Sequence, residues 1–218
     1  MVANITMQNP QPKIVQYIAH LLSYVFHPLF IPTYFFLYLM QVLPFEFVGI
    51  TDWQLKMRLF SVAWLTAFFP AFAVFLLWRL KLSDSIFLRT QKERIIPYVI
   101  TMFFYWWMYY LSRNFADQPL ALKYFYFGIF IASAIGLTAN HFIKVSLHTM
   151  GVSGLLTAVV LVSFTYPINN LSWVVASVAI AAIVWSARMI VSDHTNKELV
   201  VGFVIGLSTQ LAAFLWVN

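Results

Sequence analysis

His194 and Glu198 are the two residues of this sequence whose types and spacing best suit chemistry. They lie four residues apart, so on a helix their side chains would share a face. A carboxylate there can accept the imidazole N–H, fix the tautomer of the ring and make it a better nucleophile. Arg188 adds a planar fork of donors that suits phosphate oxygens. The segment predicts either a site for phosphate chemistry or a polar cap that meets lipid headgroups.

A second polar segment places Lys144, Ser146 and His148 at alternating positions just before an apolar run. Together they would supply a cation, a hydroxyl donor and a proton donor beside the free N–H groups of a helix N-terminus, which is a natural anion site. The alternative is structural, because a serine at a helix start is often only an N-cap and a lone interfacial histidine usually stabilises the fold.

A third polar segment is basic and ends at a proline. It contains Arg89, Lys92 and Arg94 and reaches Pro97. Taken alone, such a cluster before an apolar run is typical of an anchor to lipid headgroups.

The composition indicates the environment of these segments. Of 218 residues, 62% are hydrophobic and only 9% are charged, so most of the surface must face lipid. The net charge of +6 suits anionic headgroups or a phosphate substrate, whereas the lack of a soluble basic domain argues against nucleic-acid binding. The absence of cysteine excludes disulfides and thiolate metal ligands. We therefore expect an integral membrane protein, with a bacterial inner membrane as its location.

The apolar residues form about seven runs, which predict an all-α bundle of six or seven transmembrane helices. The runs are Ile14–Val42, Met57–Leu80, Ile95–Leu111, Leu120–Asn140, Thr149–Phe164, Leu171–Met189 and Leu199–Val217. The first contains His27-Pro28 and should be kinked or broken, while the third and fifth are short enough for a tilted or partly inserted helix. No repeat or linker divides the chain, so a single domain over 1–218 is expected.

Seven spans would bring the polar segments together. The connections 81–94, 141–148 and 190–198 would then lie on the same side of the membrane as the N-terminus. The positive charges are too evenly distributed to predict which side that is.

In chain order, these segments resemble the type-2 phosphatidate phosphatase superfamily, which includes the vanadium haloperoxidases. The third family motif is Ser-Arg-x5-His-x3-Asp, and Arg188, His194 and Glu198 keep its spacing with Glu in place of Asp. The second motif is Pro-Ser-Gly-His, of which Ser146 and His148 are kept.

The match is less close elsewhere. Val145 and Leu147 replace the Pro and Gly of the second motif. The first motif is Lys-x6-Arg-Pro; counting back from Pro97 puts Arg89 at the Lys position, while Arg94 has to serve as the Arg. The resemblance spans roughly residues 80–210.

The resemblance implies a metal-independent lipid-phosphate phosphatase without a cofactor. His194 would attack phosphorus and form a phosphohistidine, Glu198 would orient it, and His148 would protonate the leaving group. The residues implied to bind the phosphate are Arg188, Arg94, Arg89, Lys144 and Ser146. The substrate would be a prenyl diphosphate, phosphatidate or phosphatidylglycerol phosphate, and the other partners membrane lipids; the oligomeric state is not predicted.

Two alternatives stay open at the sequence level. The first is a degenerate member of the family that binds or transports lipid without catalysis. The second is an intramembrane serine protease, because Gly151-Val-Ser153-Gly154 has the Gly-x-Ser-Gly form of such enzymes, although small residues at this spacing commonly pack helices. We expect His20 and His27, which neither motif uses, to be buried structural histidines.

Overall fold

The computed structural model describes residues 11–88, 90–191 and 194–217, and this part of the chain is all-helical without strands. This confirms the all-α prediction. Its α-helices are α1 (Lys13–Val25), α2 (Ile31–Val42), α3 (Asp52–Ala63), α4 (Phe69–Arg79), α5 (Ile95–Asn114), α6 (Leu120–Asn140), α7 (Leu147–Thr165), α8 (Leu171–Val191) and α9 (Asn196–Val217). Two 3-10 turns, η1 (Pro28–Phe30) and η2 (Pro44–Phe47), and a π-helical turn, η3 (Trp64–Phe68), complete the described elements.

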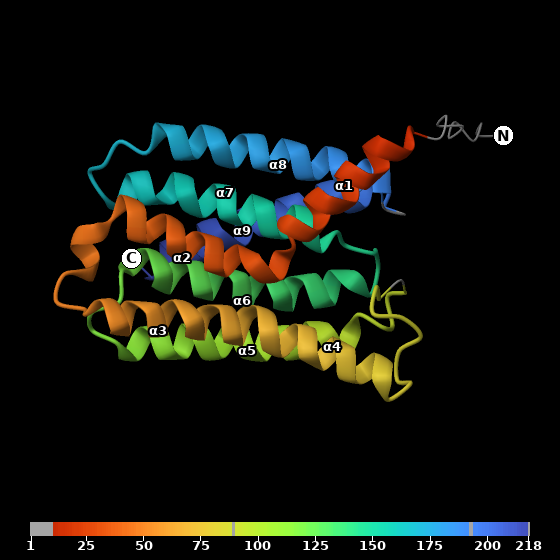
Figure 1. The fold of residues 1–218 in the computed structure, drawn as a ribbon, viewed down its shortest axis with the longest axis horizontal. Coiled ribbons are helices and arrows are strands. Elements are labelled where there is room, and N and C mark those ends of the chain that lie inside the picture. The colour runs from red at the N-terminus through yellow and green to blue at the C-terminus, as the bar shows by residue number, and fades with distance from the viewer. Residues whose placement is uncertain (1–10, 89, 192–193, 218) are drawn as a thin grey trace.

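Six helical segments of the described chain are long and apolar enough to cross a membrane. They are Lys13–Val42, Asp52–Arg79, Leu120–Asn140, Leu147–Thr165, Leu171–Val191 and Asn196–Val217. The remaining long helix, α5, has 20 residues, or about 30 Å, and runs beside the others (Figure 1). The third and fifth apolar runs lie within α5 and α7. These helices are longer than the runs, because they continue into the polar residues at the ends of the runs.

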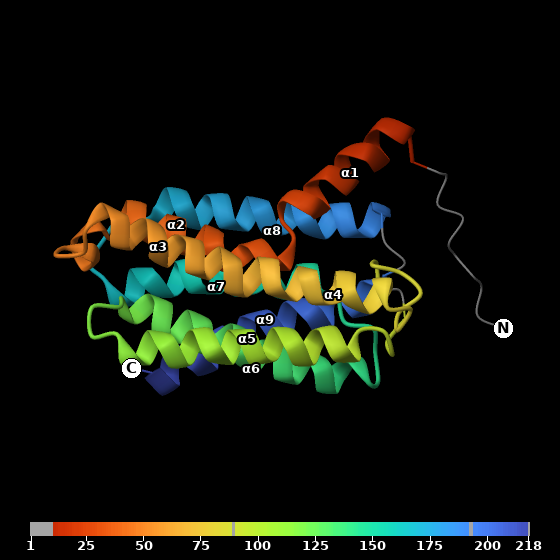
Figure 2. The same cartoon turned by 60° about the horizontal axis from the view of Figure 1, so that its bottom comes forward.

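The first span is broken where the proline predicts it. After α1 the chain makes the 3-10 turn at Pro28 and continues as α2, and the Tyr34 hydroxyl donates to the Val25 carbonyl across the break at 2.7 Å. Figure 2 shows the consequence: α2 runs along the bundle, whereas α1 diverges from it toward the N-terminus. The break leaves His27 as the N-cap of η1, facing the interior rather than continuing a helix surface.

The helices α6, α7 and α9 form the centre of the bundle. The closest approach is between α7 and α9, where Gly202 faces the Ser146 carbonyl and Gly206 faces the Met150 carbonyl with no room for a Cβ. Gly202 and Gly206 thus permit another helix to approach closely, as small residues do in membranes. The crossing fixes the start of α7 against the start of α9.

The connections alternate between the two ends of the bundle (Figure 1). The segments that join α4 to α5, α6 to α7 and α8 to α9 lie at the end where α1 begins, and the C-terminus lies at the other end. The predicted gathering of the three polar segments at one end is therefore confirmed.

Candidate functional site

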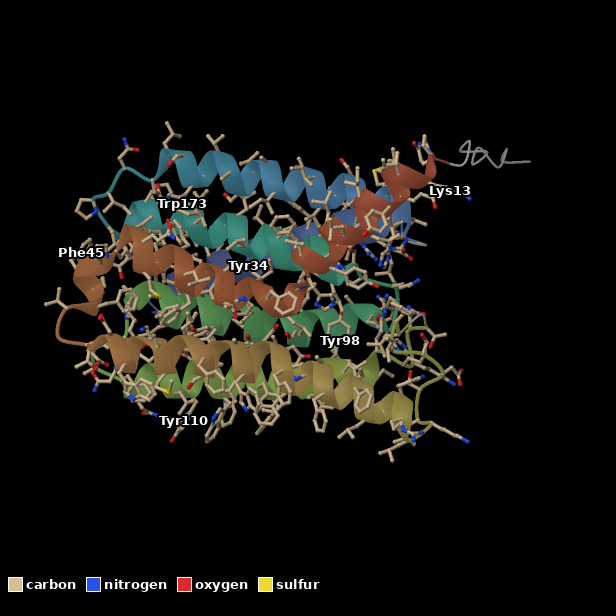
Figure 3. The ribbon with its side chains drawn as sticks, viewed as in Figure 1. Lys13, Tyr34, Phe45, Tyr98, Tyr110 and Trp173 are labelled. Atoms are coloured by element: carbon tan, nitrogen blue, oxygen red, sulfur yellow. The ribbon has the colours of Figure 1, made fainter. Side chains whose placement is uncertain are left out.

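Hydrogen bonds tie the polar connections to one another. The side chains of Gln91 and Asn140 each donate to the other's backbone carbonyl, at 2.7 and 2.9 Å. Arg94 donates through Nη1 to the Val145 carbonyl at 3.0 Å. Nitrogen-bearing side chains crowd this end of the bundle in Figure 3. Connections far apart in the sequence thus form one structure.

A cavity of about 910 Å³ begins at this polar end and extends between the helices. Its charged and imidazole-bearing lining residues are His20, His27, Arg94, Lys144, His148, Arg188 and His194. Deeper lining residues such as Pro32, Ile129 and Val74 are apolar. The cavity therefore combines a cationic end with an apolar interior, which suits an amphipathic anion.

The cavity has an exposed edge between α1 and α4. Tyr24 of α1 and Phe75 of α4 line it, and their side chains are 58% and 45% exposed. His20 lines the same edge and is exposed, so our expectation of a buried structural histidine is wrong at this position.

His194 and Glu198 make the contact that their spacing predicts. Nδ1 of His194 lies 2.9 Å from Oε2 of Glu198, and only 3% of the imidazole side chain is exposed. Because the carboxylate accepts, Nδ1 carries the proton and the lone pair of the neutral ring is on Nε2. His194 lines the cavity, so a nucleophilic nitrogen belongs to the same space as the arginines.

A capping box explains how the sequence builds this contact. Helix α9 begins at Asn196, so Thr195 precedes it and Glu198 is its third residue. The Thr195 N–H donates to Oε2 of Glu198 at 2.9 Å, and the Glu198 N–H donates to the Thr195 hydroxyl at 3.4 Å. This reciprocal pair requires Glu or Gln at the third position. The same carboxylate oxygen therefore caps α9 and accepts from His194.

The buried position of His194 also fixes its protonation state. Burial lowers the pKa of the imidazole, the positive charges of Arg94 and Arg188 lower it further, and the hydrogen bond to Glu198 opposes them. The net effect is a pKa below the ordinary value of 6.5. His194 is therefore neutral at pH 7, with a free lone pair for attack.

Arg94 is held rigidly at the start of α5. Besides the bond to Val145, its Nε donates to the Leu88 carbonyl at 2.9 Å. Leu88 has φ 49, an uncommon conformation for a residue with a Cβ, and this turns its carbonyl toward the arginine. These two bonds use the N–H of Nε and one N–H of Nη1, so the other N–H groups of the guanidinium are available to a ligand. Arg188 lines the same cavity from α8, and Lys144 lines its rim.

His148 has a partner outside the predicted motifs. Its Nε2 lies 3.0 Å from the Ser23 carbonyl of α1, and because a carbonyl only accepts, Nε2 carries a proton. The ring of His27 stands 5.2 Å from it, centroid to centroid, at 85°. The sequence did not predict that the Ser23 carbonyl and the His27 ring would contact His148. The kink expected at His27-Pro28 was the only signal that this segment turns inward.

Searches of protein-family models, curated proteins and solved structures give no match for this chain.

The structure places one of the predicted phosphate ligands, Ser146, differently from the others that it describes. Ser146 is fully buried, does not line the cavity, and its hydroxyl accepts from the Thr149 N–H as the N-cap of α7. Its backbone N–H donates to the Glu198 carbonyl at 3.3 Å, so its visible role is to join α7 to α9. In this structure the hydroxyl oxygen serves as a helix cap, and phosphate binding by Ser146 stays a prediction. Arg89 lies outside the described residues.

The geometry also bears on the protease alternative. Ser153 is fully buried, donates to the Met150 carbonyl of its own helix at 3.1 Å, and packs against Gly206 of α9. It does not line the cavity that contains His194. The small residues around it serve helix packing.

As for metals, the described residues contain no group of three or more His, Cys, Asp or Glu side chains arranged to hold an ion.

The lowered pKa of His194 gives a testable pH dependence. Only neutral imidazole reacts with an acylating reagent such as diethyl pyrocarbonate, so modification of His194 must decline as acid protonates it. Because the pKa lies below 6.5, half-maximal modification is expected below pH 6.5. Mass spectrometry of the His194 peptide across pH 5 to 8 measures this, and a midpoint above 6.5 would contradict a lowered pKa for this imidazole.

Proposed function

We propose that this protein is a membrane lipid-phosphate phosphatase that works through a phosphohistidine intermediate. The observation that carries the proposal is the His194–Glu198 contact of 2.9 Å inside a cavity shared with Arg94, Arg188 and His148. A buried neutral imidazole with an oriented lone pair, beside guanidinium groups, is suited to attack an anionic phosphorus centre. The resemblance to the type-2 phosphatidate phosphatase superfamily in residue order supports the same chemistry.

In the first step, Nε2 of His194 forms a bond to phosphorus as the bond from phosphorus to the lipid oxygen breaks. His148 gives a proton to that oxygen. Since Nε2–H of His148 is bound to the Ser23 carbonyl, the proton that moves is the one on Nδ1. The transfer therefore requires the doubly protonated ring, which the Ser23 carbonyl and the negative charge of a bound phosphate would both favour. Arg94 and Arg188 neutralise the charge that develops on the phosphoryl oxygens.

In the second step, water attacks the phosphohistidine and the bond between Nε2 and phosphorus breaks. His148, now lacking its Nδ1 proton, takes a proton from the water. Phosphate leaves, and both histidines return to their starting states. Glu198 stays hydrogen-bonded to Nδ1 of His194 throughout and stabilises the positive charge that its ring carries as the intermediate.

The shape of the cavity supports a lipid as the substrate. Its cationic end lies at the polar end of the bundle, where a phosphate at the membrane surface would be, and its apolar part borders the lipid between α1 and α4. A prenyl diphosphate, phosphatidate or phosphatidylglycerol phosphate would each fit this arrangement.

The proposal is tested by measuring phosphate release from these three lipid classes in detergent micelles, with a chelator present. Release by the purified protein is the expected result. Binding of lipid phosphates without any release would instead support the non-catalytic alternative, a lipid-binding or transport protein. Release that a chelator abolishes would contradict the metal-independent mechanism.

A further inference from the structure

Tyr98 has a hydroxyl group that no residue of the described chain binds. It lies on α5, is only 4% exposed, and its oxygen has no hydrogen-bond partner. Tyr98 lines the cavity that contains His194. Figure 3 shows it inside the bundle, in the half that carries Lys13 and the polar connections. A buried hydroxyl without a partner is costly, and the usual reason for keeping one at a cavity wall is a ligand that pairs with it.

The structure makes room for this ring. A Cβ at Gly136 of α6 would lie 3.0 Å from Cε1 of Tyr98 and 3.2 Å from its hydroxyl oxygen. The ring therefore sits against α6 at a position where only glycine leaves it undisturbed.

The depth of Tyr98 indicates what it could bind. Arg94 precedes it by one helical turn, so the hydroxyl-bearing residue lies about 6 Å further along α5 from the phosphate end. In an ester-linked glycerolipid, the acyl carbonyls follow the phosphate at about the length of the glycerol backbone. A tyrosine hydroxyl can donate to such a carbonyl. A prenyl monophosphate carries no acceptor beyond its phosphate and would leave the hydroxyl unpaired.

We propose that Tyr98 donates a hydrogen bond to an ester carbonyl of the substrate, which makes the preferred substrates ester-linked glycerolipid phosphates. The inference rests on the proposed phosphatase function and names its substrate class. Tyr98 then determines specificity and takes no part in proton transfer. A site built to hydrogen-bond a substrate group discriminates against an analogue that lacks it.

The test compares two phosphatidates with the same chains, one ester-linked and one ether-linked, which differ only in the carbonyls. The wild-type protein is expected to prefer the ester by about two- to tenfold in kcat/KM, the value of one neutral hydrogen bond. Tyr98→Phe should remove the preference by slowing the ester substrate alone. Since the hydroxyl has no protein partner, this variant should keep the stability of the wild type.

Two tyrosines of the same protein serve as matched controls. Tyr105 lines the same cavity two turns deeper on α5, and Tyr126 has a buried unpaired hydroxyl away from the cavity. Tyr105→Phe and Tyr126→Phe should both keep the ester preference.

Three outcomes would overturn the inference: no ester preference in the wild type, a preference that survives in Tyr98→Phe, or faster release from prenyl phosphates than from either phosphatidate. In all three the phosphatase function would stand. Absence of release from every lipid phosphate would instead refute the proposed function itself.

Discussion

Replacing His194 with alanine should reduce phosphate release by at least about 1000-fold, because it removes the group that we propose forms the bond to phosphorus. The imidazole is buried and lines the cavity, and its loss leaves the arginines able to bind the phosphate without cleaving it. Lipid-phosphate binding by the variant should therefore persist. Initial rates of phosphate release, together with equilibrium binding of a lipid phosphate, measure both properties.

Two variants control for this result. His141→Ala removes an exposed histidine that stands near the same polar end but does not line the cavity, and Ser153→Ala removes the serine that a protease would need. Both should retain phosphate release close to that of the wild type. An active His194→Ala protein would refute the phosphohistidine mechanism, whereas loss of release in Ser153→Ala with an intact fold would revive the protease alternative.

Trapping the phosphohistidine intermediate tests the role of His194 more directly. Rapid acid-free quenching during turnover of a ³²P-labelled lipid phosphate should leave label on the protein, stable to alkali and labile to acid as a phosphoramidate is. The label should map to the peptide that contains His194. Turnover that leaves no such label in the wild type would point to direct attack by water.

The sequence predicts the elements of this structure well because its signals are local. Apolar runs of span length mark the helices, and Pro28 marks the break between α1 and α2. Because successive connections alternate between the two ends of the bundle, the polar segments can be assigned to one end without knowing how the helices pack. The spacing of His194 and Glu198 predicts their contact for the same reason, since both belong to the start of one helix.

Contributions from distant parts of the chain are what the sequence does not predict. The Ser23 carbonyl reaches His148 only because the C-terminal end of α1 lies against the start of α7, and a backbone carbonyl carries no sequence signal. Ser146 is a different case. Its place in a motif predicts that its hydroxyl binds phosphate, but in the structure this hydroxyl caps the start of α7. Tyr98 is one aromatic residue among many on α5, and only its unpaired hydroxyl in the cavity distinguishes it.

The double role of Glu198 leads to the second large effect. Its Oε2 accepts from both His194 Nδ1 and the Thr195 N–H, so an alanine would lose the helix cap and the orientation of the imidazole together. Glutamine separates the two roles. Its amide oxygen can still cap α9, since Glu and Gln both serve at this position, but it lacks the negative charge that stabilises the charged imidazole.

Glu198→Gln is therefore expected to lower kcat by about 100- to 10,000-fold, in line with the loss when a triad carboxylate becomes an amide. Its thermal stability should stay near that of the wild type, whereas Glu198→Ala should lose about 0.5–2 kcal/mol of stability from the cap as well. Thermal unfolding and kcat measured on the same preparations separate these effects.

If Glu198→Gln kept full activity, the carboxylate would be only a helix cap, and its geometry beside His194 would have no part in catalysis. If the glutamine variant instead lost stability and activity together, the cap would account for both. The expected pattern, activity lost with the fold retained, arises only if one oxygen serves the helix and the nucleophile at once.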